Sequence, residues 1–383
     1  MYAAGCGVRA ATIQCNAFSE RPSEGMTVGV STTSGYLARK NATPVVSLGE
    51  GYLSVRVQTA LMAAHQALRG RDLLDFTDYT SEEIMSLLQL GLVLKEAQRT
   101  GFSHAVLAGK TLGLIFEKAS TRTRISFEVG MFQLGGHALF LPSGSTQMGR
   151  GEPISDTAQV MARYVDGVMI RTFGHNIVQE FAKYSSVPVI NGLTDQHHPC
   201  QALADAMTVL EHKGTLEGVT LAYIGDGNNM ANSWLQIAPK LGMNIRIASP
   251  TGYLPDQQYI EEAKKVAVAA GSQVLVTTDP TRAVEGADVI CTDVWASMGN
   301  EDEAEERKKA LADYQVNAQL AAKAKDDYVF IHCLPAHRGE EVTEDIIDGP
   351  HSIVFDEAEN RLHAQKAVMA ALMADAGAFG EER

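Results

Sequence analysis

From about residue 70 onward, short apolar runs alternate with segments whose apolar residues recur every three or four positions. The runs are typical of buried strands, and the longer spacing is typical of helices that present one face to a core. Strands are predicted at 110–116, 138–141, 167–171, 187–190, 219–224, 244–248, 273–276, 287–292, 328–332 and 352–355. Because strands and helices alternate, we expect an α/β fold of two domains, each a parallel sheet flanked by helices and joined to the other by interdomain helices.

Several helices carry their own boundary signals. Thr80-Ser-Glu-Glu83 has the form of a capping box and predicts a helix that runs toward Arg99. A long helix is expected from about Gln201 to His212 with a stop at Gly214, and a final apolar helix at 358–374. The predicted division is therefore 69–205 for the first domain, 206–350 for the second, and 351–383 for a C-terminal helix that packs back on the first domain.

The stretch FEKASTRTR, residues 116–124, places five polar residues where a buried strand ends. The next residues have the spacing of a buried helical face, at Ile125, Val129 and Phe132. The polar residues therefore occupy a strand-to-helix turn. Such a helix N-terminus attracts phosphate, and the guanidinium of Arg122 suits phosphate oxygens. The plainer alternative is that Ser120 only caps the helix and that the arginines are surface charges.

Specialised side chains also follow other predicted strands, where an α/β fold binds its ligands. These residues are Arg171, His197-His198, Gly225-Asp-Gly-Asn-Asn229, Asp293 and His332-Cys333. Arg171 and His198 at neighbouring strand ends favour an anion site over the plainer reading of the turn.

Composition narrows the class of protein. The 383-residue chain has a net charge of −14, which argues against a nucleic-acid binder, and it has no apolar run of the roughly 18 residues that a membrane span needs. Its five cysteines lack any Cys-x-x-Cys spacing, which argues against a disulfide framework or a zinc ribbon and fits a reducing compartment.

The first 45 residues differ from the rest of the chain. They hold only Glu20 and Glu24 as acids and are rich in Ser, Thr, Ala and Gly. This bias predicts an organellar transit segment within residues 1–60; a disordered tail without an address is the alternative.

Four motifs in this order resemble the transcarbamylase family, and within it the members that use ornithine. They are Ser120-Thr-Arg-Thr-Arg124, His198-Pro-Cys-Gln201, Asp293-Val-Trp-Ala-Ser-Met-Gly299 and His332-Cys-Leu-Pro335. The resemblance runs from about residue 69 to 374. The first motif resembles a carbamoyl phosphate site shared by the whole family, and the last two point to ornithine. The His-Pro-Cys-Gln form is similar to plant and algal members.

The resemblance implies a role for each matching residue. The phosphate of carbamoyl phosphate would be held by Ser120, Thr121, Arg122 and Thr123. Its carbamoyl end would be engaged by Arg171, His198, Gln201 and Thr123, with Gln147 reaching the site from a loop near a subunit boundary. The amino-acid end of ornithine would be bound by Asn229, Asp293, Ser297 and Met298. The junction between the two substrates would be lined by Cys333, Leu334 and Arg361.

The implied reaction transfers the carbamoyl group to the δ-amine of L-ornithine and gives L-citrulline and phosphate. The expected catalytic residues are Arg122, Arg171, His198 and Cys333. Arg171 and His198 would donate to the developing oxyanion, and Cys333 would accept or relay a proton if it has thiolate character. No metal and no organic cofactor is expected. The implied assembly is a homotrimer with active sites between subunits, in arginine biosynthesis or a urea cycle, with a plastid favoured over the mitochondrial matrix.

Three other functions stay open at this stage. Gly225-Asp-Gly227 follows a strand as in dehydrogenases, but Met230 stands where a dinucleotide fingerprint needs its third glycine. An inactive binding scaffold of the same shape, or an enzyme for putrescine or another amine, would share most of the motifs. The family resemblance also implies a cis peptide at Leu334–Pro335, and we expect residues 300–309 to form a loop that closes over ornithine.

Overall fold

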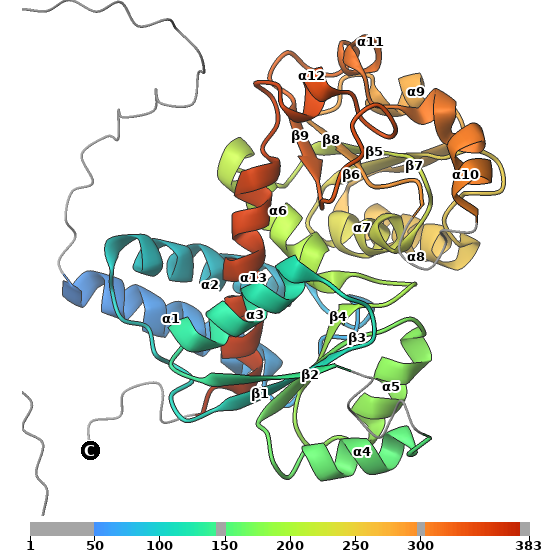
Figure 1. Cartoon of the computed structure of the whole chain (residues 1–383). Coiled ribbons are helices and arrows are strands. Elements are labelled where there is room, and N and C mark those ends of the chain that lie inside the picture. Colours follow the sequence, from blue (N-terminus) through green and yellow to red (C-terminus); the bar gives the residue numbers. More distant parts are fainter. Residues whose placement is uncertain (1–49, 143–150, 297–302, 376–383) are drawn as a thin grey trace, which may run out of the picture. The chain divides into compact units, whose positions relative to one another are not determined.

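The computed structural model describes residues 50–142, 151–296 and 303–375. Residues 1–49 of the predicted transit segment lie outside them, but residues 50–60 begin a helix whose Leu53 and Val57 are buried in the core, so the predicted segment extends too far. The first domain contains the strands β1 (Thr111–Phe116), β2 (His137–Pro142), β3 (Gly167–Arg171) and β4 (Val189–Leu193). Its helices are α1 (Glu50–Leu68), α2 (Ser81–Thr100), α3 (Thr121–Gln133), α4 (Ile154–Met161) and α5 (His175–Tyr184). Figure 1 shows this sheet with helices on both sides.

The second domain has the same construction. Its strands are β5 (Thr220–Ile224), β6 (Asn244–Ala248), β7 (Val274–Thr277), β8 (Val289–Thr292) and β9 (Val329–His332). The remaining helices are α6 (Pro199–Lys213), α7 (Asn229–Lys240), α8 (Gln257–Ala270), α9 (Pro280–Val284), α10 (Ala304–Leu311), α11 (Ala318–Ala321), α12 (Glu344–Ile347) and α13 (Val354–Met373), with a 3-10 turn at Ala312–Tyr314. The predicted α/β fold of two parallel-sheet domains is confirmed.

Both sheets are parallel throughout, with the strand orders β2-β1-β3-β4 and β7-β6-β5-β8-β9. The chain therefore changes direction across the first sheet between β1 and β3, and across the second between β5 and β8. At such switch points the loops that leave neighbouring strands diverge and open a crevice at the carboxyl ends. The residues that follow these four strands are the ones that the sequence marks as specialised.

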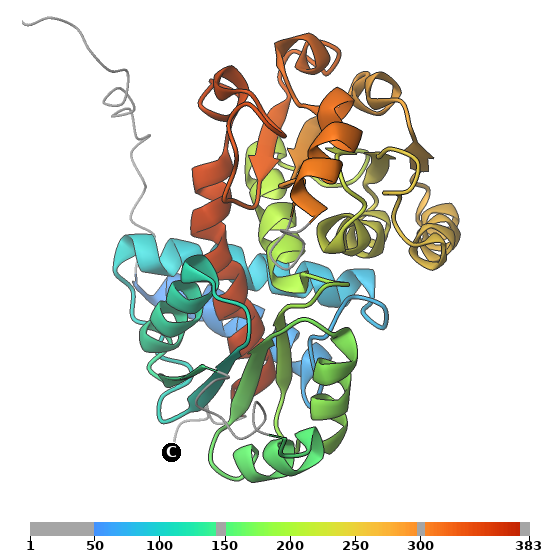
Figure 2. The same ribbon diagram turned by 45° about the vertical axis from the view of Figure 1, so that its right-hand side comes forward.

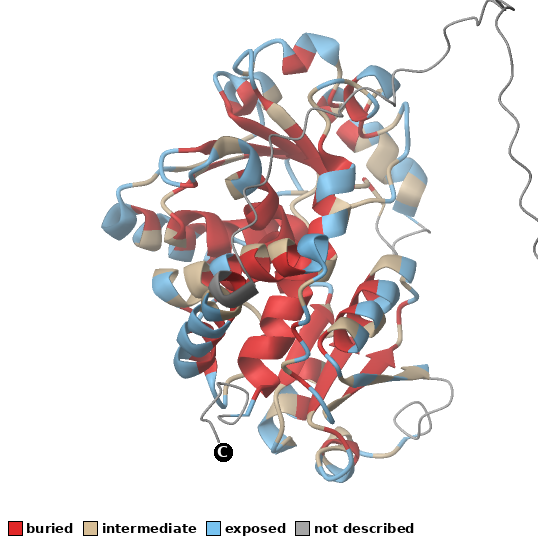
Figure 3. Ribbon diagram, turned by 90° about the vertical axis from the view of Figure 1, so that its left-hand side faces the viewer, coloured by how far each residue is buried: buried red, intermediate tan, exposed pale blue. Residues whose placement is uncertain are grey.

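Two long helices, α6 and α13, join the domains. Helix α13 packs against α1, α2 and α3 of the first domain and against α6, and it also contacts β9 of the second sheet. Figure 2 shows this helix passing from the second domain into the first. Its second half is mostly apolar and buried, and Figure 3 shows the burial. Hydrophobic burial of this kind stabilises the arrangement at about 25 cal/mol per Å², so α13 is a rigid support for residues that it carries toward the second sheet.

The boundary signals of two helices hold. Thr80 caps α2 in a full capping box with Glu83, and Gly214 ends α6 in the left-handed conformation at φ 74°. One predicted strand is wrong, because Val354 begins α13 and Ser352 forms only an isolated bridge with Phe330. A short apolar run fits a buried helical turn as well as a strand, and the acids that follow it stabilise a helix N-terminus.

The predicted buried face of α3 is also wrong. Ile125, Val129 and Phe132 are 54%, 37% and 79% exposed, and the helix buries Phe127, Gly130 and Met131 instead. The cause lies in close packing on α13, because a Cβ at Gly130 would come within 2.8 Å of the Met369 side chain. The exposed residues form an apolar stripe along α3, which we call the α3 stripe.

None of the described helices combines the length and apolar character that a bilayer crossing requires.

Candidate active site

A cavity of about 620 Å³ lies at the carboxyl ends of both sheets. Every predicted site residue that the structure describes lines this cavity: Ser120, Thr121, Arg122, Thr123, Arg171, His198, Gln201, Asn229, Asp293, Cys333, Leu334 and Arg361. The other three, Gln147, Ser297 and Met298, lie outside the described residues. Segments more than 200 residues apart in sequence, such as Ser120 and Cys333, therefore form one site.

One end of the cavity is the N-terminus of α3. Ser120 is the N-cap residue, and its Oγ accepts a hydrogen bond from the Thr123 N–H at 3.2 Å. The amides of Thr121 and Arg122 belong to the first turn, which has no carbonyl partner within the helix. Partial positive charge and N–H groups are thus directed at the cavity, as a phosphate site requires.

Three arginines gather at the same end from three elements. Arg122 of α3 donates to the Leu334 carbonyl, and Arg361 of α13 donates to the Gln201 side chain and, at 3.2 Å, to Thr123 Oγ1. Arg171 ends β3, and its Nε has no hydrogen-bond partner among the described residues. Burial, followed by the charges of Arg361 and Arg122, lowers the pKa of Arg171 to about 10. Such a cluster of cations, of which Arg171 and Arg361 are buried, favours an anion between them.

His198 lies beside these arginines at the start of α6. Its backbone N–H donates to Ser233 Oγ at 2.8 Å, which fixes the residue against α7. Burial, with further contributions from Arg361, Arg171 and Arg122, lowers the pKa of His198 well below its usual value. The imidazole is therefore neutral, and Nδ1 has no partner among the described groups. A neutral imidazole can still donate an N–H hydrogen bond, which is the role predicted for His198.

The opposite wall presents a carboxylate and a thiol. Asp293, directly after β8, accepts a hydrogen bond from Asn228 Nδ2 at 2.8 Å and one from Cys333 Sγ at 3.1 Å. Burial, followed by the nearby Asp293 carboxylate, raises the pKa of Cys333 well above its usual value. Cys333 is therefore a protonated thiol in this geometry, and the thiolate character that a proton-accepting role would need is absent.

Comparisons with known proteins agree with this division of the site. The carbamoyl phosphate-binding domain model of the aspartate/ornithine carbamoyltransferases matches residues 71–211, and their aspartate/ornithine-binding domain model matches residues 217–372. The ornithine carbamoyltransferase of Anoxybacillus flavithermus is 57% identical over 82% of this chain and 99% of its own length. The chain belongs to the ornithine carbamoyltransferase family.

Other members extend the comparison. The anabolic ornithine carbamoyltransferase of Pyrococcus furiosus is 56% identical over 80% of this chain and 98% of its own length. A solved structure of the ornithine carbamoyltransferase from that organism superposes with a TM-score of 0.78 at 56% identity, over 80% of this chain and 98% of the other. The predicted enzyme family is confirmed. These relatives are bacterial and archaeal, so they do not support the plant or algal likeness read from His-Pro-Cys-Gln.

A pair of buried carboxyl groups, Asp205 and Glu357, holds Gln201 at the arginine end of the cavity. Gln201, whose carbonyl oxygen holds Arg361, donates its amide to Asp205 at 2.7 Å and to Glu357 at 3.0 Å. Burial raises the pKa of Asp205 to about 7 and that of Glu357 well above its usual value, the latter also through the neighbouring Asp205. The two carboxyls therefore share a proton near neutral pH.

This pair predicts a specific dependence of stability on pH. Both pKa values are raised in the folded state. The contribution of this pair to the free energy of unfolding is therefore fully present below about pH 4 and is lost as the pH rises toward and past about 7. Glu357→Gln mimics the protonated form of Glu357. Between pH 6 and 9 the free energy of unfolding of this variant is therefore expected to fall by about 2 kcal/mol less than that of the wild type. Urea titrations across this range measure the difference, with the exposed Glu180→Gln as control. Parallel pH profiles for wild type and Glu357→Gln would contradict the shared proton.

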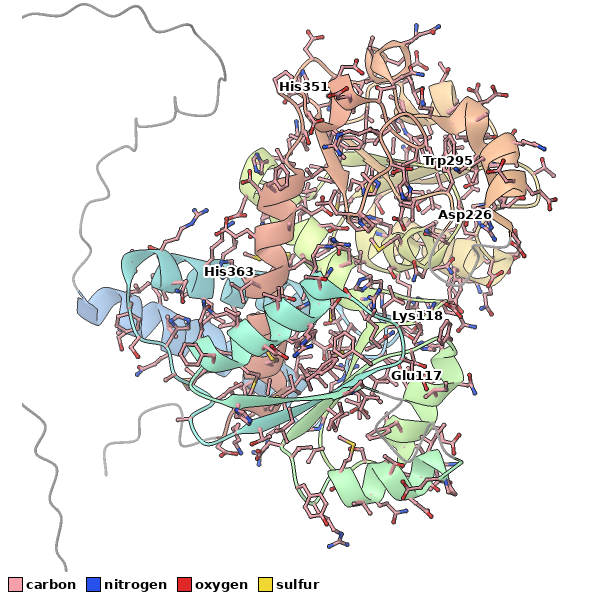
Figure 4. The ribbon with its side chains drawn as sticks, viewed as in Figure 1. Glu117, Lys118, Asp226, Trp295, His351 and His363 are labelled. Atoms are coloured by element: carbon pink, nitrogen blue, oxygen red, sulfur yellow. The ribbon has the colours of Figure 1, made fainter. Side chains whose placement is uncertain are left out.

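Several lining residues were not among the predicted site residues, although Asp226 lies in the Gly225–Asn229 stretch that the sequence analysis singled out. Lys118 donates to Asp195 at 2.5 Å, and Asp226 forms an ion pair with Arg307 at 2.6 Å; Figure 4 labels Lys118 and Asp226. Lys118 lies two residues before Ser120, so its position was a usable signal. Nothing in the sequence pointed to Arg307, because its partner Asp226 lies 81 residues away and because the stretch around Arg307 was predicted to be a loop. From Ala304 to Leu311 that stretch is helix α10, and residues 300–302 lie outside the described chain.

The expected cis peptide is confirmed at Leu334–Pro335, where Leu334 has a φ of 55°. Its carbonyl accepts the Arg122 hydrogen bond across the cavity.

Proposed function

We propose that this chain transfers the carbamoyl group of carbamoyl phosphate to the δ-amine of L-ornithine, giving L-citrulline and phosphate. The observation that carries the proposal is the polarity of one cavity, with buried arginines and a helix N-terminus at one end and Asp293 at the other. An anionic acyl phosphate fits the first end and an amino acid's ammonium group fits the second. By this assignment residues 69–205 bind carbamoyl phosphate and residues 206–350 bind ornithine.

The residues divide the chemistry between them. We assign the phosphate to Ser120, Thr121, Arg122 and Thr123, and the carbamoyl oxygen to Arg171, His198 and Thr123, whose donors stabilise the oxyanion as the amine attacks. The cationic surround disfavours the ammonium form of the δ-amine, which has an ordinary pKa of about 10.4. As the new C–N bond forms, the C–O bond to phosphate breaks, and the amine proton leaves with the departing phosphate. The α-amine of ornithine pairs with Asp293, beside Asn229, Ser297 and Met298.

The assay that tests this proposal compares four acceptors with carbamoyl phosphate: ornithine, putrescine, acetylornithine and aspartate. Turnover with ornithine alone, abolished in Arg122→Ala, is the expected result. Turnover with putrescine in place of ornithine would overturn the assignment of the acceptor, and binding of carbamoyl phosphate without any turnover would favour an inactive scaffold. The relative named as anabolic supports a biosynthetic direction, with citrulline made for arginine.

We propose that the working form is a homotrimer, and the α3 stripe supports a contact between copies. Ile125, Val129 and Phe132 form one exposed apolar row, and Leu139 of the edge strand β2 is 40% exposed. Isolated exposed apolar residues are ordinary, but a continuous row on one helix marks an interaction surface. Gln147 follows β2 in sequence, and we propose that it serves a neighbouring site.

Phe132→Glu is expected to convert the trimer to monomers and to lower citrulline formation at least ~10-fold at assay concentrations, because a charge would be buried in an apolar contact. Light scattering coupled to size exclusion measures the change. Val268→Glu is the matched control, since Val268 is 85% exposed on α8 and lies outside the α3 stripe. A trimeric Phe132→Glu variant, or a monomeric wild type, would contradict the proposed contact.

We also propose that residues 1–49 direct the chain to an organelle, with a plastid favoured over the mitochondrial matrix. The acid-poor, hydroxyl-rich composition of this segment supports the proposal. A fusion of residues 1–49 to a fluorescent reporter tests it in cells that hold both organelles. A reporter that stays in the cytosol would contradict import.

A further inference from the structure

Two histidines and an aspartate form a buried cluster outside the carbamoyl phosphate cavity. They are His175 at the start of α5, His197 just before α6, and Asp75 in the segment between α1 and α2. His175 is 4% exposed and His197 2%, and none of the three lines the cavity described above. Each offers one ligand atom, and these atoms lie within 4.8 Å of one another. Nothing in the carbamoyl transfer uses this cluster.

The hydrogen bonds of His175 leave one ring nitrogen facing a carboxylate. Its Nδ1 lies 3.1 Å from Thr194 Oγ1, and that hydroxyl donates its own proton to the His197 carbonyl at 3.4 Å. In the tautomer whose Nδ1–H donates to Thr194, Nε2 carries a lone pair. In the other tautomer Nε2–H faces Asp75 and, against the effect of burial, contributes to the lowered pKa of that carboxyl group. Nε2 lies 3.4 Å from Asp75 Oδ2 and makes no aligned hydrogen bond there. A charge-assisted bond would be shorter, at about 2.7–2.9 Å.

His197 has the same arrangement. Its Nε2 lies 3.0 Å from the Tyr259 hydroxyl of α8, while its Nδ1 is buried and without a partner among the described residues. A metal-binding histidine usually gives its other ring N–H to a neighbouring oxygen, which fixes the tautomer and the ring orientation. Thr194 does this for His175 and Tyr259 does it for His197. With these tautomers, two buried nitrogen lone pairs lie beside a carboxylate, and such a ligand set suits a divalent cation.

A second cavity, of about 460 Å³, reaches one member of the cluster, Asp75. Asp72 and Asp78 also line it, and so does Arg71. The Asp75 side chain is 19% exposed, so it is the member of the cluster that a cation would meet first. Acidic residues at an entrance raise the local concentration of cations.

We propose that Asp75, His175 and His197 bind a divalent transition metal ion, with zinc the best fit. Two imidazoles and one carboxylate, with water in a fourth position, are a ligand set that zinc uses. Ligand atoms about 2.0 Å from zinc at tetrahedral angles lie roughly 3.3 Å apart, close to the 3.4 Å between His175 Nε2 and Asp75 Oδ2. The ion would join the first domain to Tyr259 of the second and hold the segment that ends at His198.

Zinc titration calorimetry of the metal-stripped full chain tests the proposal. The other candidate clusters, Asp293–His332–Cys333 and His337–Glu340–Glu341, require a background that removes them, so the titrations use Cys333→Ser together with His337→Gln. In that background we expect one zinc per chain. His197→Gln and, separately, His175→Gln are each expected to weaken binding at least ~100-fold, and Tyr259→Phe about 10–100-fold.

Control variants distinguish loss of the zinc site from loss of the fold. His212→Gln, which changes a histidine outside all three clusters, is expected to leave zinc binding unchanged. Far-ultraviolet circular dichroism establishes that each variant is folded, and the two histidine variants are independent of each other. An absence of zinc binding in the double-variant background, or binding that neither histidine variant weakens, would overturn the proposal. Neither outcome depends on citrulline formation.

Discussion

Arg171→Ala is expected to lower kcat for citrulline formation about 10²–10³-fold, the loss that follows removal of one oxyanion donor. Arg171 ends β3 at the switch point of the first sheet, and its Nε has no partner among the described residues. The donor is thus held for a charge that develops only during the reaction. KM for carbamoyl phosphate is expected to rise much less, because the phosphate is assigned to Arg122 and the first turn of α3.

Stability separates this role from a structural one. Burial, with Arg361 and Arg122 nearby, already lowers the pKa of Arg171, so in the free enzyme its charge is unfavourably placed. Arg171→Ala is therefore expected to keep or raise the free energy of unfolding while activity falls. The exposed Arg282→Ala of α9 is the control for loss of an arginine elsewhere. Unchanged kcat, or a loss of activity that follows a loss of stability, would contradict the oxyanion assignment.

The sequence was a good guide to the site because chemistry in an α/β fold gathers at strand ends. Ser120 and Arg171 lie at the ends of neighbouring strands of the first sheet, and Cys333 follows a strand of the second. Parallel pairing brings the ends together within each sheet without further information. The site residues at strand ends can therefore be predicted from local sequence, because each follows a strand that the sequence also predicts.

What the sequence could not supply depends on contacts between distant elements. The α3 stripe has helical periodicity, but periodicity alone does not say which of two apolar faces meets α13; the small Gly130 decides it by allowing close approach. The run at 352–355 is ambiguous for a similar reason, because its fate depends on α13 packing across both domains. The protonated state of Cys333 follows from burial beside Asp293, a contact across 40 residues.

Asp293→Asn is expected to reduce kcat/KM for ornithine on the order of 10²-fold or more while leaving the affinity for carbamoyl phosphate unchanged. The carboxylate is buried, and Asn228 fixes it at 2.8 Å, so its pairing with the α-amine of ornithine takes place away from bulk water. Truncating one partner of such a buried charge pair costs about 2–5 kcal/mol, which is this range of affinity. Initial rates at varied ornithine, with calorimetric titration of carbamoyl phosphate, measure both quantities.

The same substitution has a second readout that does not involve ornithine. Burial is the first cause of the raised pKa of Cys333 and the Asp293 carboxylate is the second, so neutralising Asp293 lowers that pKa while leaving the thiol buried. A larger thiolate fraction means faster alkylation of Cys333 by iodoacetamide at a fixed pH, because the thiolate is the nucleophile. Asp348→Asn, an exposed residue paired with Arg338, controls for the loss of one negative charge. Slower ornithine turnover with unchanged Cys333 reactivity would mean that Asp293 binds the substrate but does not set the pKa of the thiol. An unchanged KM for ornithine would contradict the assignment of Asp293 to the ornithine site.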